Sequence, residues 1–202
     1  MSRSLAPPAL SVVVAALNEG RNLRHTIDCL QSSLPAGSEI MVVDDGSEDG
    51  CSDFLGSRAS VRLVRSDHLG VAKARNLGAA LSRGRTIVFA DAHIRVEAGW
   101  WRPLVEVLRQ PKVGAVAPAI SNIHQPQDKG FGLRFQGAEL SVEWLEQQGS
   151  KPYPVPLLPG CCWAMRRKVF QATGGFDSGL ISWGSTDNEM SLRLWLLGYE
   201  LW

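Results

Sequence analysis

The sequence predicts an α/β fold in which a mixed, mainly parallel sheet is flanked by helices. Short apolar, β-branched runs alternate with segments whose apolar residues recur at helical spacing, as in a parallel sheet joined by crossover helices. Polar residues follow directly after three of these apolar runs. The 202 residues, of which 45% are hydrophobic and 20% charged, suffice for one substantial core. We therefore expect one domain over residues 1–202.

The first half of the chain supplies the regular alternation. Strands are predicted at residues 11–15, 39–44, 61–64, 86–90 and 113–117. Helices are predicted at residues 23–34, 72–81 and 100–108, with a further short helix before the third strand. Breakers such as Gly37 and Gly84 separate these elements.

The second half is less regular. Residues 121–130 are predicted to form a polar loop, and residues 131–144 either an antiparallel strand pair or a helix. A strand at 161–165, a short helix at 168–172, a helix at about 187–197 and a strand beginning near residue 199 complete the chain.

Composition and charge exclude several classes of function. The formal net charge of +1 gives no electrostatic footprint for nucleic acid. No apolar run is long enough to span a bilayer, and the first residues lack the pattern of a signal peptide. The four cysteines form no C-x-x-C pair, and Cys161 and Cys162 are expected to be packing residues rather than nucleophiles. These features predict a cytoplasmic protein with reduced thiols.

Carboxylates follow three of the predicted strands at the point where each strand ends. Asn18 and Glu19 follow the first strand, Asp44 and Asp45 the second, and Asp91 and His93 the fourth. The carboxyl ends of parallel strands meet at one edge of a sheet, where doubly wound folds bind ligands. We therefore expect these side chains to converge there.

Asp91 and His93 lie two residues apart at the end of an apolar run, so both side chains should point to the same face. A carboxylate and an imidazole suit Mn²⁺, whereas Mg²⁺ prefers oxygen donors alone. Taken alone, Asp-x-His would also fit an ordinary strand terminus. The two other acidic strand ends favour the metal-ligand interpretation.

Several motifs resemble those of the GT-A glycosyltransferases of family 2. They lie at residues 16–19, 43–47, 74–78, 91–93, 166–170 and 174–177. The Asp-x-His motif occupies the position of the family's Asp-x-Asp. Together with Val96, Trp100, Leu104 and Gly184, it resembles that of the polypeptide N-acetylgalactosaminyltransferases.

The resemblance implies a GT-A (Rossmann-like) fold and transfer of a sugar from a nucleotide-sugar, expected to be a UDP-sugar, to an acceptor hydroxyl. Residues 1–117 would form a nucleotide-binding half, and residues 118–202 an acceptor-side half. The implied cofactor is Mn²⁺ or Mg²⁺. The acceptor would be a glycan, a lipid or a protein, with peripheral membrane association left open.

The resemblance also implies a set of nucleotide-binding residues: Ala16, Asn18, Glu19, Asp44, Asp45, Lys73, Arg75 and Asp91. One of Asp44 and Asp45 is expected to be structural, and Asp45 is favoured as the nucleotide contact. Glu19 could contact the ribose, brace Lys73 or Arg75, or merely favour the dipole of the next helix. Lys73 and Arg75 could each meet a phosphate, and the alternative, a solvated helix face, is weaker for Arg75.

Asp187 is the candidate catalytic base, because inverting family members place an aspartate near this position to deprotonate the acceptor. Inversion is therefore favoured, and retention stays open. The sequence from Thr186 to Glu189 also fits a capping box, in which Asp187 would only favour the helix dipole. Trp183, Gly184 and Glu189 are the expected sugar- and acceptor-binding residues.

Two other functions compete with this interpretation. A nucleotidyltransferase would need a glycine-rich loop after the first strand, and residues 17–21 hold only one glycine. A module that binds nucleotide-sugars without catalysis would keep the same acidic strand ends. Release of UDP from UDP-sugars distinguishes an enzyme from such a module.

Overall fold

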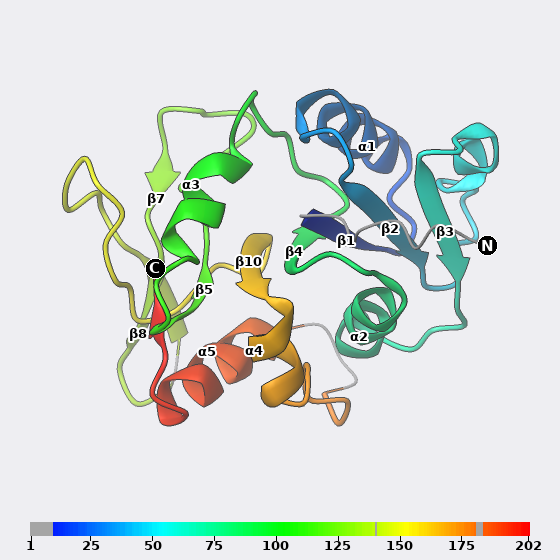
Figure 1. Cartoon of the computed structure of the whole chain (residues 1–202). Helices are drawn as coiled ribbons and strands as arrows, with labels where there is room; N and C mark the ends of the chain where they lie inside the picture. The colour runs from blue at the N-terminus through cyan, green and yellow to red at the C-terminus, as the bar shows by residue number, and fades with distance from the viewer. Residues whose placement is uncertain (1–9, 140, 181–183) are drawn as a thin grey trace, which may run out of the picture.

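The computed structural model describes residues 10–139, 141–180 and 184–202. Its central sheet is built from β1 (Leu10–Ala16), β2 (Glu39–Asp44), β3 (Val61–Arg65), β4 (Thr86–Asp91), β5 (Val113–Val116), β10 (Cys162–Arg166) and β11 (Glu200–Leu201). These strands lie in the order β11-β5-β10-β4-β1-β2-β3 (Figure 1). β10 runs antiparallel to β4 and β5, and the other pairs are parallel. The prediction of a mixed, mainly parallel sheet is therefore confirmed.

Helices cover both faces of this sheet. They are α1 (Arg21–Ser33), α2 (Val71–Leu81), α3 (Trp101–Val107), α4 (Arg167–Ala172), α5 (Thr186–Leu196) and the 3₁₀ helix η1 (Asp53–Ser57). α1 and α3 lie on one face, and α2, α4 and α5 on the other (Figure 1). None of the described helices is long and apolar enough to cross a membrane.

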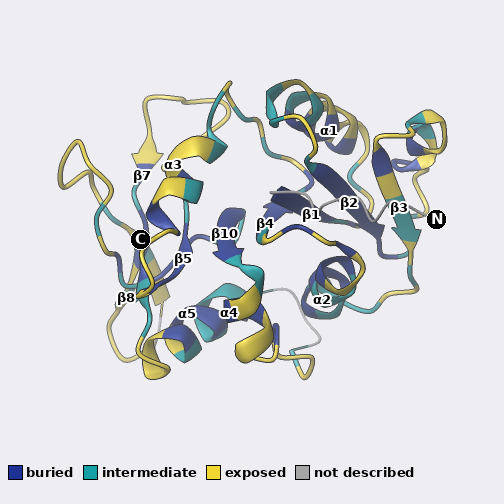
Figure 2. Ribbon diagram, viewed as in Figure 1, coloured by how far each residue is buried: buried dark blue, intermediate teal, exposed yellow. Residues whose placement is uncertain are grey.

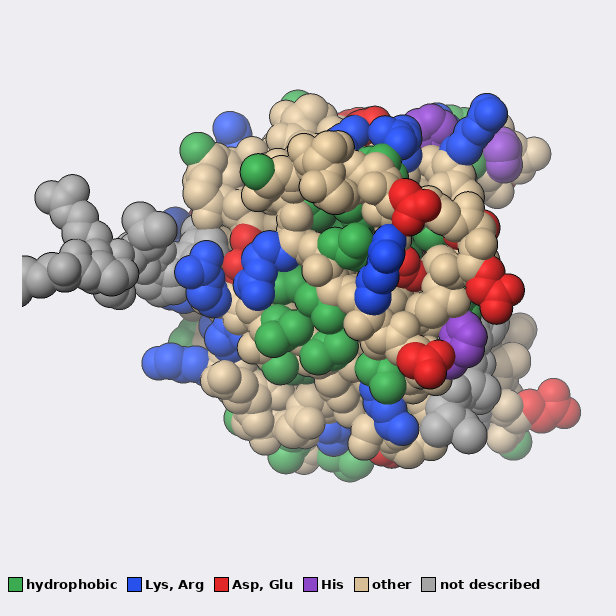
Figure 3. All heavy atoms as spheres, turned by 90° about the vertical axis from the view of Figure 1, so that its right-hand side faces the viewer, with side chains coloured by type: hydrophobic (Ala, Val, Ile, Leu, Met, Phe, Trp, Pro, Cys, Tyr) green, Lys and Arg blue, Asp and Glu red, His purple; other side chains and the backbone are tan. Residues whose placement is uncertain are grey.

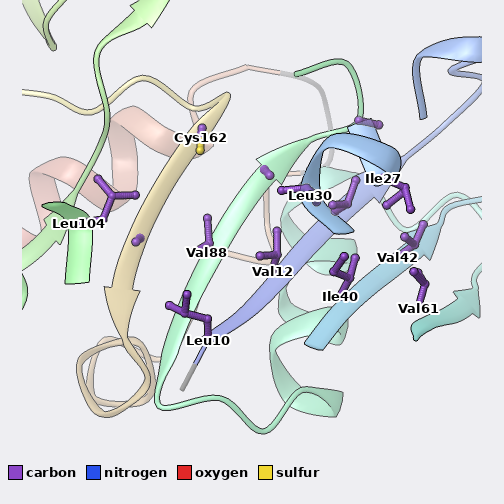
Figure 4. Packing of buried hydrophobic residues seen from close by; sticks show 14 of the residues in the cluster. Leu10, Val12, Ile27, Leu30, Ile40, Val42, Val61, Val88, Leu104 and Cys162 are labelled. Atoms are coloured by element: carbon purple, nitrogen blue, oxygen red, sulfur yellow. The ribbon is translucent and has the colours of Figure 1, made fainter. Parts of the chain in front are cut away.

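Alternate residues of the central strands serve the two helical layers. Val12 and Val42 belong to the apolar cluster that includes Ile27 and Leu30 of α1 (Figure 4). Val13 belongs to the opposite cluster, which includes α2, α4 and α5 side chains. Because successive side chains point to opposite faces, a strand covered on both sides must be apolar throughout. The central strands are accordingly buried along their length (Figure 2).

Two regions left open by the sequence are settled by the structure. Residues 131–144 contain the antiparallel pair β8 (Leu133–Gln136) and β9 (Ser141–Trp144), so the alternative of a helix there is wrong. The ends of the expected polar loop pair as β6 (Ile120–Ser121) and β7 (Lys129–Gly130).

The register of β1 aligns the strand ends. Ala15 lies opposite Asp91 of β4, and Ala16 lies opposite Asp44 of β2. Because β10 is antiparallel, its first residue, Cys162, pairs with Ala90 at this same edge. Four strands thus place polar backbone or side chains around one point.

A buried polar cluster lies at the other end of the strands, where β1, β2 and β4 begin. The carboxylate of Glu39 accepts hydrogen bonds from the Ser11 hydroxyl and from the backbone N–H groups of Arg83 and Gly84. Burial alone would raise the pKa of Glu39, but these hydrogen bonds and the Arg83 charge lower it overall. The ionised carboxylate therefore ties the start of β2 to β1 and to the turn before β4.

Both signs of charge occur on the side of the molecule where β3 is the edge strand of the sheet. Acidic and basic side chains are interspersed on this side, with apolar side chains between them (Figure 3). A face of this kind presents no single-sign field.

Replacing Glu39 with Gln should lower the free energy of unfolding by about 1–3 kcal/mol near pH 7, because a buried carboxylate with several donors is lost. The folded-state pKa is depressed, so this stabilisation is present above the unfolded pKa of about 4.3 and is lost as pH falls through the folded value. Urea unfolding at several pH values should show the two proteins converging in acid. A difference that stays constant down to the acid transition would contradict this role.

The matched control for this experiment is Glu106→Gln. Glu106 is exposed and pairs with Arg109 on the surface, so its loss should change stability by less than about 0.5 kcal/mol.

Gly78→Ala should destabilise the fold, although alanine normally stabilises a helix by about 1 kcal/mol relative to glycine. A Cβ at Gly78 would lie 2.4 Å from Val13 Cγ1 and 3.1 Å from Val43 Cγ2, between α2 and the sheet. Such overpacking costs about 1–3 kcal/mol, so we expect a net loss in urea unfolding. Gly56→Ala, where a Cβ meets nothing within 4 Å, is the control. A Gly78→Ala variant that is more stable than the wild type would refute the close approach of helix and sheet.

Candidate functional site

Asp91 and His93 come together at the carboxyl end of β4. Asp91 Oδ2 lies 3.8 Å from His93 Nε2, and His93 Nδ1 lies 3.2 Å from Glu19 Oε1. The imidazole is therefore placed between two carboxylates from different strand ends. Glu19 does not brace Lys73 or Arg75, as one alternative supposed; its partner is His93.

The donor chemistry of this pair fits a divalent cation. Asp91 Oδ2 and His93 Nε2 face each other, and both side chains are partly exposed. Across the three described ranges, no group of three or more His, Cys, Asp or Glu side chains is arranged to hold a metal. One or two protein ligands are the usual number where substrate phosphates complete the coordination of Mg²⁺. Asp91 and His93 are thus the residues that would hold Mn²⁺ or Mg²⁺ here.

Asp91 sits in an unusual electrostatic environment. Burial raises the pKa of Asp91 above its usual range, and the nearby Asp187 charge acts in the same direction, while Arg75 and His93 oppose the rise. The raised pKa reflects the cost of burying the negative charge of this carboxylate, and nearby positive charge offsets that cost.

Arg75 of α2 occupies the centre of the site. Its Nη2 donates to Asp91 Oδ1 (2.9 Å) and to the Gly160 carbonyl (2.8 Å), and its Nη1 donates to Asp187 Oδ1 (2.7 Å). The guanidinium is also 5.5 Å from the centre of the Phe176 ring. The side chain is only 4% exposed. One arginine therefore joins α2, β4, the segment before β10 and α5.

Asp187 lies in the first turn of α5, and its side chain is 24% exposed. The helix does not begin with the capping box that the sequence suggested. Its N-cap is Ser185, in the left-handed region at φ 61°, and no side chain caps the helix. Glu189 instead forms an ion pair with Arg193 at 2.7 Å, one turn along the helix. Asp187 is thus free of a capping box and points toward Arg75.

Gly160 is required by this packing. A Cβ at this position would lie 1.9 Å from Asp187 Oδ2. The carbonyl of the next residue, Cys161, accepts the N–H of Asp91 at 2.8 Å. Gly160 is absent from the site residues predicted from the sequence, although a glycine directly before a strand that reaches the candidate site is a usable signal.

The end of β2 forms a second part of the site. Asp44 is buried and accepts hydrogen bonds from the Ser47 N–H (3.0 Å) and the Ser52 hydroxyl. Burial alone would raise the pKa of Asp44, but these hydrogen bonds lower it overall. Asp44 lines a polar cavity of about 290 Å³ together with Arg65 and Ser66.

Asp45 has a different environment. Its Oδ1 accepts hydrogen bonds from the Ser66 hydroxyl and the Leu69 N–H, and its Oδ2 accepts one from the Gly70 N–H, each at 2.8 Å. Gly70 is the N-cap of α2. A carboxylate there satisfies donors at the helix start and favours the helix dipole. Asp44 and Asp45 are both buried and both accept hydrogen bonds from neighbouring turns, so the choice of Asp45 as the nucleotide contact stays a prediction.

The remaining nucleotide-side residues lie around the turn after β1. Asn18 has φ 54°, and its Oδ1 accepts the Glu48 N–H at 2.8 Å. The Ala16 carbonyl accepts the Asp45 N–H at 2.9 Å. Lys73 is half-buried on α2. The turns after β1 and β2 are thereby tied together.

On the acceptor side, Trp183 lies outside the described residues. Gly184, at φ 105°, precedes α5, and a Cβ there would meet nothing within 4 Å among the described atoms. Trp163 is buried in an aromatic cluster with Phe89 and Phe176, as expected for a core residue.

A larger cavity of about 820 Å³ opens beside His93. Its lining includes Trp100, His124, Lys129 and Cys161. Burial raises the pKa of the Cys161 thiol to about 12, which keeps it neutral and supports a packing role rather than a nucleophilic one.

Comparison with known proteins gives consistent results. The family model described as "Glycosyl transferase family 2" matches residues 11–174. Polypeptide N-acetylgalactosaminyltransferase 4 of Mus musculus is 29% identical over 218 residues, covering 96% of this chain and 38% of the mouse protein. A putative polypeptide N-acetylgalactosaminyltransferase 13 of Drosophila melanogaster is 32% identical over 219 residues, covering 95% and 39%. The chain thus spans less than half the length of these relatives.

Two solved structures share the fold. GalNAc-T7 with UDP, GalNAc and Mn²⁺ superposes with a TM-score of 0.80 at 21% identity, covering 99% of this chain and 42% of that one. Mannosyltransferase PcManGT from Pyrobaculum calidifontis, in complex with GDP-Man and Mn²⁺, gives 0.74 at 22% identity, covering 97% and 54%. With the family model matching most of its length, this chain belongs to glycosyl transferase family 2.

Proposed function

We propose that this chain is the catalytic domain of a metal-dependent glycosyltransferase that transfers a sugar from a UDP-sugar to an acceptor hydroxyl. The observation that carries the proposal is the meeting of Asp91, His93 and Asp187, from separate parts of the chain, at one edge of the sheet. Family membership supports the reaction class. The relatives named as N-acetylgalactosaminyltransferases support UDP as the nucleotide, since the GalNAc-T7 structure holds UDP.

The donor would lie along the ends of β1, β2 and β4. Its nucleoside would enter the cavity beside Asp44, with Asn18 and the backbone near Ala16 shaping the turn above it. Its diphosphate would reach Asp91 and His93, with Lys73 as a candidate phosphate contact. Asp45 would stabilise this site indirectly, because its carboxylate accepts the Gly70 N–H at the start of α2.

A divalent cation, when bound, supplies positive charge for the departing diphosphate. The chain's own residues make that possible. Glu19 lies against His93 Nδ1, so it can fix the tautomer that leaves the Nε2 lone pair free for a metal. Asp91 contributes Oδ2 on the same side.

Asp187 would accept the proton of the acceptor hydroxyl. Its Oδ1 is held by Arg75, and no hydrogen bond to its Oδ2 occurs within the described segments. The 820 Å³ cavity beside His93 would admit the acceptor, which could be a glycan, a lipid or a protein. Glu189 and Gly184 stay candidate acceptor contacts, although the Glu189 carboxylate is paired with Arg193.

Asp91→Asn should abolish the Mn²⁺-dependent part of UDP binding, because an amide is a poor replacement for a carboxylate ligand. We expect the affinity for UDP in excess Mn²⁺ to fall at least about 100-fold in calorimetry, the upper range for losses at metal sites. Asp28→Asn, on the surface of α1, should leave the affinity unchanged. Equal affinity of wild type and Asp91→Asn would remove Asp91 from the site.

Asp187→Asn should spare donor binding and slow transfer. Loss of a general base costs about 10²–10⁴ in rate, so kcat at saturating donor should fall within that range while the UDP affinity changes less than about threefold. UDP release from UDP-GalNAc and other UDP-sugars measures turnover. Asp177→Asn, at an exposed loop position, is the control. Normal turnover by Asp187→Asn would exclude it as the base, and a wild type that binds UDP-sugars without turnover would indicate a binding module.

A further inference from the structure

We propose that Arg75 is a positioning residue that orients the carboxylates of Asp91 and Asp187 and so couples the cation site to the acceptor-side base. This inference rests on the proposed function. It assigns Arg75 a role different from the phosphate contact expected from the sequence.

The two carboxylates use their oxygen atoms differently. Asp91 gives Oδ1 to Arg75 Nη2 at 2.9 Å, and its Oδ2 faces His93 Nε2 at 3.8 Å. Asp187 gives Oδ1 to Arg75 Nη1 at 2.7 Å, while its Oδ2 packs against Gly160. In each carboxylate, one oxygen is held by the guanidinium and the other makes no hydrogen bond to it.

The geometry of the guanidinium makes this double contact possible. Its donors form a rigid planar fork, so two carboxylates bound to different nitrogens have a fixed relative position. Without the positive charge between them, Asp91 and Asp187 would repel each other, as the upward effect of Asp187 on the pKa of Asp91 shows. Arg75 therefore sets both the distance and the orientation of the two acids.

The fork is itself held in place. The Gly160 carbonyl accepts a third hydrogen bond at 2.8 Å, and the Phe176 ring lies 5.5 Å away. The neighbouring Asn76 donates to the Phe176 carbonyl at 2.8 Å and accepts its N–H at 2.9 Å. Two consecutive residues of α2, Arg75 and Asn76, thus connect the Gly160 and Phe176 segments and α5 to β4.

Burial of Arg75 argues against a direct phosphate contact. The side chain is 4% exposed, and its Nη atoms already donate to three oxygens of the protein. At 4% exposure, the guanidinium presents almost no surface on which a phosphate could bind. The three occupied donors hold Asp91, Asp187 and Gly160, so the contacts that are made serve the protein's own groups.

The test is Arg75→Lys, which keeps the charge but replaces the fork with a point charge on a flexible stem. A lysine can pair with one carboxylate but cannot orient both. We expect kcat with a UDP-sugar to fall at least about 100-fold and the gain in UDP affinity from Mn²⁺ to shrink about tenfold, in the range of losses from outer-shell partners of metal ligands. The affinity for UDP in EDTA should stay unchanged, because no phosphate contact is lost.

A double variant sharpens the test. At saturating UDP-sugar and Mn²⁺, the effect of Arg75 on the cation site is suppressed and its effect through Asp187 remains. Arg75→Lys combined with Asp187→Asn should then have nearly the same kcat as Asp187→Asn alone, since residues that act as a unit are not additive. Arg167→Lys is the matched control. Arg167 is also a partly buried arginine with three protein partners, Gly84, Ala79 and Ser82, but these lie outside the site. Its kcat should match the wild type.

Each other outcome overturns the inference. Equal loss of UDP affinity with and without Mn²⁺ would make Arg75 a phosphate contact. Activity losses in Arg75→Lys and Arg167→Lys that match in size and follow their losses of thermal stability would leave Arg75 only a structural role. Additive losses in the double variant would separate Arg75 from Asp187. A wild type that neither binds UDP with Mn²⁺ nor turns over a UDP-sugar refutes the proposed function itself, whatever the variants do.

Discussion

The register between β1 and its two neighbours is the constraint on which the site depends. Ala15 and Ala16 lie opposite Asp91 and Asp44, so a single strand sets the spacing of acids that are distant in the sequence. A slip of one residue would turn every side chain of β1 to the other face and disrupt both apolar clusters. The packing of the sheet on both faces therefore also secures the geometry of the site.

The alternation of side chains along β4 explains which helices pack against Asp91. Ile87 and Phe89 pack into the layer that contains α2 and α5, and Asp91 continues their side of the strand beyond the apolar core. Arg75 and Asp187 approach from those two helices. A carboxylate at the last position of a buried strand meets a buried arginine there, which offsets part of its desolvation. The same arrangement leaves one oxygen of Asp91 on the side of His93.

Much of the fold could be predicted because the relevant signals are local. The apolar runs that became β1, β2 and β4 and the helical spacing of α1 and α2 need only neighbouring residues to be recognised. Strand periodicity and the general rule for parallel sheets predicted that Asp91 and His93 lie close together, although β4 ends at Asp91 and His93 lies in the turn after it. The alternative of a helix over residues 131–144 failed because long-range pairing decides the structure of such a mixed segment.

The site was predictable in its residue types but not in its partners. The Thr186 to Glu189 pattern suggests a capping box, yet Glu189 pairs with Arg193 one turn further along the same helix, and Ser185 in the left-handed region is the N-cap. Asp44 and Asp45 are adjacent in the sequence, and only the structure shows that Asp45 accepts the Leu69 and Gly70 N–H groups at the start of α2. Crystals of the chain grown with UDP and Mn²⁺ and measured at the manganese absorption edge would test the account most directly. We predict an anomalous peak bound to Asp91 and His93 and to the diphosphate. UDP bound in the sheet-edge site with manganese absent from these two side chains would contradict it.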